Sequence, residues 1–295
     1  MKITITGGTG FIGKWFLKSF VDEHELIVLG RNREALIPGV DETAYTYLQT
    51  DYSKTHLCEL LKGSDAVVHL AAKRTNAGGF ESYWPNMAIS YNLFESCLET
   101  GINNIVALST ISVYSEANSL PWSEDQKVSP LSLYGISKTT MENLAEYYNK
   151  VHDLKIKCLR VAQVLGLYER SGFMLNTFIE QARRKEELKV YGRGEGRREY
   201  IYVKDVVSAI KKALDQNVPA GLFNIGTGVN ISHLELGNLI NYIFDNKDNL
   251  TLVPGIEEDI SIFLMDISKA EKVLGWTPKW SMGEGLNDIK IIMAD

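Results

Sequence analysis

The sequence has few of the features that mark specialised classes of protein. Its 295 residues include 7 prolines and 3 cysteines, and no apolar run approaches the roughly 18 residues that a membrane-spanning helix needs. Acidic residues outnumber basic ones by 37 to 31, so the formal net charge is −6, which argues against a general binder of nucleic-acid backbones. With 45% hydrophobic and 23% charged residues, the chain has the composition of a globular protein. We expect a cytoplasmic protein with no nucleic-acid and no membrane partner.

The few cysteines also argue against a metal centre. Cys58, Cys97 and Cys158 each lie alone in an apolar segment, without the C-x-x-C spacing of metal and redox sites. We interpret them as reduced thiols of the core. His69 lies in an apolar strand and is expected to pack inside the sheet, since a single histidine makes no metal site. The sequence therefore predicts no metal.

Short β-branched runs alternate with amphipathic helical segments in the first half of the chain. The runs cover residues 3–6, 26–29, 45–48, 66–70, 105–108 and 156–161. This alternation predicts an α/β fold, a Rossmann-like doubly wound parallel sheet. Later strands are expected at 200–203 and 222–225, where the alternation is lost. We therefore expect a larger domain of residues 1–165 plus about 200–228, and a smaller C-terminal lobe of about 166–199 plus 229–295.

A glycine-rich segment follows the first expected strand and opens a helix. It reads Thr6-Gly7-Gly8-Thr9-Gly10-Phe11-Ile12-Gly13. Without Cβ atoms, the backbone can approach a pyrophosphate, which then lies on the N–H groups at the positive end of the helix. Strand, glycines and helix in this order predict a dinucleotide site, so the larger domain is expected to be the dinucleotide-binding domain and the smaller one the substrate-binding lobe. We assign Gly7, Gly10, Phe11, Ile12 and Gly13 to cofactor binding.

The second strand helps to choose between NAD and NADP. It ends in Leu29-Gly30-Arg31-Asn32-Arg33 and lacks the carboxylate that usually meets the ribose of NAD. Arg31 or Arg33 could instead bind a 2′-phosphate, which leans the prediction toward NADP, although two solvated loop arginines are the alternative. Asp51, after the third strand, is placed to accept from the adenine amino group. A helix N-cap is the alternative role for Asp51.

A tyrosine and a lysine form the candidate catalytic pair. Tyr134 and Lys138 are four residues apart on an expected helix and so share one face. An ammonium group beside a phenol lowers the phenol's pKa, which makes Tyr134 a candidate general base. Tyr134 would take the proton of a substrate hydroxyl while the same carbon gives hydride to a nicotinamide. Thr110, at the end of a strand, can hydrogen-bond the carbonyl oxygen that forms.

These motifs together resemble the extended short-chain dehydrogenase/reductases, and specifically the nucleotide-sugar epimerase/dehydratase branch. The resemblance covers nearly the whole chain. It includes the glycine motif, His69-Leu70-Ala71-Ala72, Ser109-Thr110-Ile111-Ser112-Val113-Tyr114, Tyr134-Gly135-Ile136-Ser137-Lys138, Arg198-Glu199-Tyr200-Ile201-Tyr202-Val203 and Leu274-Gly275-Trp276-Thr277-Pro278. It implies that Ala71 and Ala72 line the cofactor site, that Lys138 also meets the ribose hydroxyls, and that Thr110 is the active hydroxyl rather than Ser109 or Ser112.

The resemblance also implies a set of substrate residues. Asn86 matches the asparagine of the family's site, although an ordinary first-turn asparagine is the alternative. Ser112 is expected to contact substrate or to support Thr110. Gln163 lies where an asparagine commonly contacts the sugar nucleotide, and Arg198 lies where the family holds the diphosphate.

The family's second diphosphate arginine is missing. The chain has Ile256-Glu257-Glu258-Asp259 at that place, and such an acidic run would repel a diphosphate. We expect that either Arg193 or Arg197 substitutes, or that the substrate is less anionic.

Two positions indicate the reaction. The 4,6-dehydratases of this branch carry an acidic pair directly after the active threonine, whereas this chain has Ile111 and Ser112. No acid stands ready to protonate a leaving hydroxyl, so we predict an NAD(P)-dependent 4-epimerase of the UDP-glucose or UDP-N-acetylglucosamine type, working through a transient 4-keto sugar. An NADPH-dependent 4-keto-sugar reductase is the alternative. A cofactor-sensing protein without turnover is a third possibility.

The resemblance finally implies a homodimer built from the helices expected at 86–98 and 134–152. The apolar positions offered for the interface are Leu93, Phe94, Leu98, Leu144 and Tyr148. The same residues could equally form intramolecular core, because both arrangements need one apolar helix face.

Overall fold

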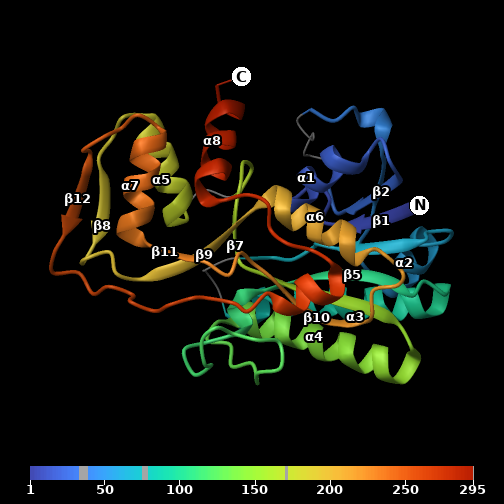
Figure 1. Cartoon of the computed structure of the whole chain (residues 1–295). Helices are drawn as coiled ribbons and strands as arrows, with labels where there is room; N and C mark the ends of the chain where they lie inside the picture. Colours follow the sequence, from blue (N-terminus) through green and yellow to red (C-terminus); the bar gives the residue numbers. More distant parts are fainter. Residues whose placement is uncertain (33–38, 75–78, 170–171, 295) are drawn as a thin grey trace.

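Seven parallel strands form the central sheet of the computed structural model, in the order β10-β6-β5-β4-β1-β2-β3 (Figure 1). The structure describes residues 1–32, 39–74, 79–169 and 172–294. The strands are β1 (Lys2–Thr6), β2 (Glu25–Gly30), β3 (Thr46–Gln49), β4 (Ala66–His69), β5 (Asn104–Thr110), β6 (Lys155–Val161) and β10 (Gly221–Ile225). The strand order reverses on either side of β1. This confirms the predicted doubly wound sheet, and ligands of such sheets bind outside the carboxyl ends of the strands near that reversal.

Helices cover both faces of the sheet. They are α1 (Phe11–Phe20), α2 (Lys54–Leu60), α3 (Trp84–Thr100), α4 (Leu133–His152) and α6 (Val203–Ala213). Helices α1 and α6 cover one face and α2, α3 and α4 the other (Figure 1). Adjacent residues of β4 accordingly serve different cores, since Val67 packs with the second group of helices and Val68 with the first. Burial on both faces explains why the strands read as continuous apolar runs.

The dimer residues predicted from the sequence turn out to be core. Leu93, Phe94 and Tyr148 are buried between α3, α4 and the sheet, and Leu98 and Leu144 pack half-buried against the same cluster. The intramolecular alternative is therefore correct for these side chains. The outward faces of α3 and α4 carry other residues.

A smaller group of elements lies beyond one end of the sheet (Figure 1). It contains a three-stranded sheet in the order β11-β9-β7 and a two-stranded sheet of β12 and β8. Its elements are β7 (Gln163–Leu165), α5 (Met174–Arg183), β8 (Leu188–Tyr191), β9 (Arg197–Tyr202), β11 (Asn230–Ser232), α7 (His233–Ile243), β12 (Leu250–Val253) and α8 (Met282–Ile292). One apolar cluster includes Ile3 of β1 and Leu286 of α8, so the two parts share a core. The division at residues 165, 200 and 228 stays a prediction.

The predicted strand at 200–203 begins earlier and lies elsewhere. It runs as β9 from Arg197, pairs with β7 and β11 outside the central sheet, and ends at Tyr202, because Val203 already begins α6. Helix α6 then returns to the central sheet.

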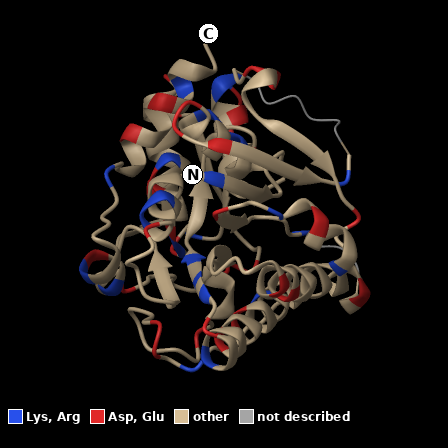
Figure 2. Ribbon diagram, turned by 90° about the vertical axis from the view of Figure 1, so that its right-hand side faces the viewer, with Lys and Arg blue, Asp and Glu red and all other residues tan. Residues whose placement is uncertain are grey.

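Basic and acidic residues are mixed along the same helices and loops (Figure 2).

Helix α4 reaches the carboxyl end of β5 and places Tyr134 there. Its N-cap is Ser132, whose side-chain oxygen accepts a hydrogen bond from the backbone N–H of Gly135 at 3.0 Å. A Cβ at position 135 would lie 2.2 Å from the carbonyl oxygen of Ser112. Glycine is therefore what allows the first turn of α4 to press against the end of β5.

Candidate active site

A cavity of about 430 Å³ opens at the carboxyl ends of the central strands. It gathers segments that are far apart in the sequence: the glycine turn before α1, the residues after β4, the end of β5, the start of α4 and the residues after β6. Eleven predicted site residues line it, namely Gly7, Gly10, Phe11, Ile12, Gly13, Ala72, Thr110, Ser112, Tyr134, Lys138 and Gln163. Ala71, Asn86, Arg31, Asp51 and Arg198 are not among the lining residues that the structure describes.

The glycine turn has the shape of a pyrophosphate cradle. Gly7 adopts a positive φ of 73°, and its carbonyl accepts from the N–H of Gly10 at 3.0 Å. Gly10 is the N-cap of α1 and makes no side-chain capping bond, so no side chain of its own covers the first N–H groups of the helix. A Cβ on Gly13 would lie 2.5 Å from the carbonyl oxygen of Gly7. These features fit a dinucleotide, whose phosphates would lie on the helix N-terminus.

The turn after β4 packs against the glycine turn. A Cβ on Gly7 would lie 2.6 Å from the backbone nitrogen of Ala71, which donates to the Thr6 hydroxyl at 3.3 Å. Ala71 thus packs against the glycine turn, and Ala72 faces the cavity.

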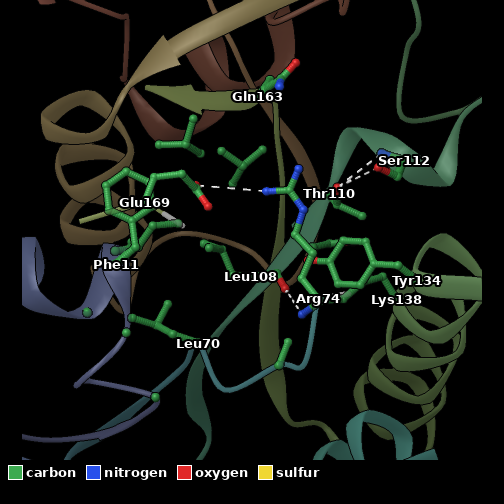
Figure 3. A pocket seen from close by; sticks show the side chains of 18 of the residues that line it. Phe11, Leu70, Arg74, Leu108, Thr110, Ser112, Tyr134, Lys138, Gln163 and Glu169 are labelled. Atoms are coloured by element: carbon green, nitrogen blue, oxygen red, sulfur yellow. Dashed lines mark hydrogen bonds and ion pairs between the residues drawn. The ribbon is translucent and has the colours of Figure 1, made fainter. Parts of the chain in front are cut away.

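The candidate catalytic pair, Tyr134 and Lys138, lies beside the end of β5 (Figure 3). Lys138 is 4% exposed and its ammonium donates to the carbonyl of Leu108 at 2.6 Å. Burial lowers the pKa of Lys138 to about 8, while Cys158 and Glu142 act in the opposite direction. The backbone N–H of Ser112 donates to the Thr110 hydroxyl oxygen at 3.2 Å. The Thr110 hydroxyl donates in turn to Ser112 Oγ at 3.3 Å, so a substrate oxygen would have to replace Ser112 as its acceptor.

Two predicted cofactor residues lie at the carboxyl ends of outer strands. Arg31 is exposed directly after β2, and Arg33 lies outside the described residues. Asp51 follows β3 and its Oδ1 accepts from the N–H of Ser53 at 2.8 Å. The N-cap of α2 is Ser53, so the alternative capping role for Asp51 is wrong.

Asn86 binds backbone within the protein. It is buried in the first turn of α3, where its Oδ1 accepts from the N–H of Lys73 at 2.7 Å and its Nδ2 donates to the carbonyl of Lys73 at 2.9 Å. The amide therefore fixes the segment that follows β4. That segment forms part of the cavity wall.

Arg198 is paired within the chain. Its guanidinium forms an ion pair with Asp259, donates to the carbonyl of Ser261 at 2.6 Å, and lies 4.3 Å from the ring centroid of Phe263. Phe263 itself lines the cavity. The acidic run that departs from the family pattern therefore neutralises Arg198.

The neighbouring arginines do not line the cavity either. The side chain of Arg193 is 84% exposed, and Arg197 pairs with Glu235 at 3.0 Å. Glu258 accepts backbone N–H groups of Arg193 at 2.8 Å and Gly196 at 3.0 Å. The acidic segment is thus folded onto the glycine-rich loop between β8 and β9.

Sequence reasoning missed an ion pair inside the cavity. Arg74 Nη1 lies 4.0 Å from Glu169 Oε2, and both side chains project into the space between the glycine turn and Thr110 (Figure 3). The guanidinium also lies 4.3 Å from the ring centroid of Phe173. The basic pair Lys73-Arg74 directly after His69-Leu70-Ala71-Ala72 was the available signal, because residues after a central strand end at the ligand edge of the sheet.

His69 and the three cysteines lie in or beside the core of the large domain. His69 is buried between the hydroxyls of Thr6 at 2.7 Å and Ser90 at 2.9 Å, and burial lowers its pKa to about 3. Cys97 and Cys158 are buried free thiols and Cys58 is half-buried. Within residues 1–32, 39–74, 79–169 and 172–294, no cluster of three metal-ligating side chains is found, and no helix could span a membrane.

Known proteins resemble this chain over its full length. The model of the NAD dependent epimerase/dehydratase family matches residues 3–226. An uncharacterised UDP-glucose epimerase of Bacillus subtilis is 30% identical, over 98% of this chain and 96% of that protein. The solved UDP-N-acetylglucosamine 4-epimerase of Bacillus cereus is 35% identical with a TM-score of 0.91, over 100% of this chain and 96% of that one. The UDP-glucuronic acid 4-epimerase of Bacillus cereus, solved with UDP-glucuronic acid and NAD, is 26% identical with a TM-score of 0.87, over 100% and 99%.

Replacing Gly13 should test the cradle. In Gly13→Ala the new methyl group would meet the Gly7 carbonyl, so we expect the dissociation constant for the dinucleotide to rise at least about tenfold, equivalent to roughly 1.4 kcal/mol. Isothermal titration calorimetry with NAD and with NADP measures this. Gly283→Ala in α8 is the matched control, because no atom lies within 4 Å of its added Cβ. Unchanged affinity in a folded Gly13→Ala variant would contradict the assignment.

Proposed function

This chain belongs to the NAD dependent epimerase/dehydratase family, and we propose that it is a nucleotide-sugar 4-epimerase acting on a UDP-glucose or UDP-N-acetylglucosamine type of substrate. The main supporting observation is that Thr110, Tyr134 and Lys138 share one cavity with the glycine turn. Ile111 and Ser112 stand where the dehydratases carry an acidic pair, and Ile111 is buried. The relatives named as UDP-sugar 4-epimerases support the same choice.

The residues of the chain can perform the proton transfers of this reaction. Tyr134 takes the proton of the C4 hydroxyl, and the buried Lys138 ammonium stabilises the phenolate. Thr110 donates to the C4 oxygen as it becomes a carbonyl. A bound nicotinamide dinucleotide, held by the glycine turn, would supply the hydride acceptor and later the donor. Tyr134 then returns the proton to the C4 oxygen of the inverted sugar.

The proposed substrate contacts come from both parts of the molecule. Gln163 and Ser112 line the cavity, with Ser112 beside Thr110, and both are assigned to the sugar (Figure 3). Arg198, packed on the cavity-lining Phe263, is assigned to the diphosphate, which would replace Asp259 as its partner. Asn86 is assigned an indirect role, because its amide holds the backbone of Lys73.

A second candidate function follows from Arg31. Its exposed position after β2 suits a 2′-phosphate, and an NADPH-dependent 4-keto-sugar reductase would use the same three catalytic residues. A cofactor-sensing role without turnover would not require them.

Replacing the proposed base tests catalysis. Tyr134→Phe should lower the rate of UDP-N-acetylglucosamine epimerisation by about 10²–10⁴-fold, because the proton acceptor is lost. The conversion is followed by ¹H NMR, and NADPH consumption with a 4-keto sugar is followed in parallel to detect a reductase. Tyr242→Phe on the exposed face of α7 is the control and should retain the wild-type rate. A Tyr134→Phe variant that keeps most of the activity would refute the proposed mechanism.

The NADP preference can be tested by binding alone. Arg31→Gln should raise the dissociation constant for NADP by about tenfold through loss of a charge-assisted contact, while that for NAD stays within about twofold. Calorimetry on wild type and variant measures both. Equal changes in the dissociation constants for NAD and NADP, or a wild-type protein that binds NAD and not NADP, would contradict the proposed NADP preference.

We also propose a homodimer formed by the outward faces of α3 and α4. Tyr91 and Tyr147 are 47% and 52% exposed there, beside the exposed Trp84 and Val151. Light scattering of the wild-type protein should give twice the mass of one chain. The double variant Tyr91→Glu/Tyr147→Glu should give the mass of one chain, because dimer formation would bury its new charges in the interface. Tyr242→Glu on α7 is the control. Wild type at the mass of a single chain would refute the dimer.

A further inference from the structure

We propose that Glu142 is a positioning residue that fixes the catalytic Lys138 and Thr110 relative to one another. Glu142 lies one helical turn after Lys138 on α4. The inference rests on the proposed proton and hydride transfer, because it concerns how the groups of that reaction are held.

Glu142 connects the catalytic helix to the catalytic strand. Its carboxylate is 4% exposed, and Oε1 accepts from the hydroxyl of Ser109 at 2.5 Å. Ser109 directly precedes Thr110 at the end of β5. A single buried carboxylate thus joins the helix that holds Tyr134 and Lys138 to the strand that holds Thr110.

A buried arginine holds Glu142 in turn. Arg160 of β6 donates from Nε to Oε1 at 3.0 Å and from Nη2 to Oε2 at 2.8 Å, and it is 2% exposed. This bidentate geometry fixes the plane of the carboxylate as well as its position. Lys138, Glu142 and Arg160 are therefore three buried charged residues, of which Lys138 lines the cavity and the other two do not.

The same arginine extends the connection toward the smaller lobe. Arg160 Nη1 donates to the Tyr114 hydroxyl at 2.7 Å, and that hydroxyl donates to Asn224 Oδ1 at 2.9 Å. Asn224 Nδ2 donates to the carbonyl of Asp266 at 3.0 Å. The segment that brings Phe263 to the cavity is therefore tied to the same network.

Several ionisable groups surround the Lys138 ammonium, and they determine how its pKa responds to the loss of Glu142. The ionisable groups that act on Lys138 are Glu142 on α4, His69 on β4 and Cys158 on β6, and Tyr134 lines the same cavity. Burial lowers the pKa of His69 to about 3 and raises the pKa of Cys158, so both are uncharged near neutrality. Glu142 is the negative charge that opposes the desolvation of Lys138, whose pKa is about 8.

Removing the Glu142 charge should move the pH dependence of kcat toward acid. Without the Glu142 charge, the pKa of Lys138 falls further below its ordinary value. The ammonium form is then lost at a lower pH, and the alkaline limb of the kcat profile moves toward acid. A carboxylate that only stabilised the fold would leave this limb in place.

Glu142→Gln provides the test, because glutamine keeps the shape and removes the charge. We expect kcat to fall about tenfold or more, with KM for the UDP-sugar within about twofold. The pKa of Lys138, read from ¹³C-lysine NMR with the signal assigned through Lys138→Met, should fall from about 8. Glu146→Gln, one turn further on α4 with an exposed partner in Lys150, is the matched control and should change neither quantity.

Ser109→Ala removes the link to β5 while leaving the ion pair, and it should lower kcat about threefold or more without moving the Lys138 pKa. The inference would be overturned if both variants fold, keep kcat within twofold of the wild-type value and leave the pKa of Lys138 unchanged. If Glu142→Gln does not fold, an unchanged kcat in Ser109→Ala overturns it. Full activity of Tyr134→Phe would instead refute the proposed function, so the two failures are distinguishable.

Discussion

The close approach of α4 to the end of β5 is the constraint on which the site depends. At position 135 there is no room for a side chain, because a Cβ would meet the Ser112 carbonyl at 2.2 Å and the Pro130 side chain at 2.9 Å. This contact sets the depth at which Tyr134 enters the cavity and brings Lys138 under the Leu108 carbonyl. Burying the Lys138 ammonium is costly. The carbonyl of Leu108 and the nearby Glu142 carboxylate offset part of that cost.

The rest of the fold delivers ligands to that point. A parallel sheet covered on both faces leaves its strand ends as the available edge, and the glycine turn, the residues after β4 and the ends of β5 and β6 all meet there. The smaller lobe supplies Gln163 at the start of β7 and Phe263 from the segment before Asp266. Both parts share one apolar core, so the two sides of the cavity are joined by packing as well as by hydrogen bonds.

Local patterns were sufficient to predict the central sheet and the position of Tyr134 and Lys138 in one cavity. The glycine turn and Tyr134 with Lys138 are set by spacing within a few residues, which the sequence displays directly. Contacts between distant segments were not accessible in this way. The pairing of Arg198 with Asp259, the ion pair of Arg74 and Glu169, and the placement of β9 outside the central sheet all depend on the tertiary fold. Likewise, the apolar pattern of α3 in the sequence is the same whether Phe94 packs within its own chain or against a second copy.

In the proposed reaction, one carbon of a sugar gives up hydride and takes it back within a single cavity. UDP-N-acetylglucosamine carrying deuterium at sugar C4 tests it most directly, with the product analysed by mass spectrometry and NMR after reaction in ordinary water. We expect an inverted C4 centre that keeps its deuterium, because the hydride never exchanges with solvent. Inversion with loss of the label to water would contradict it.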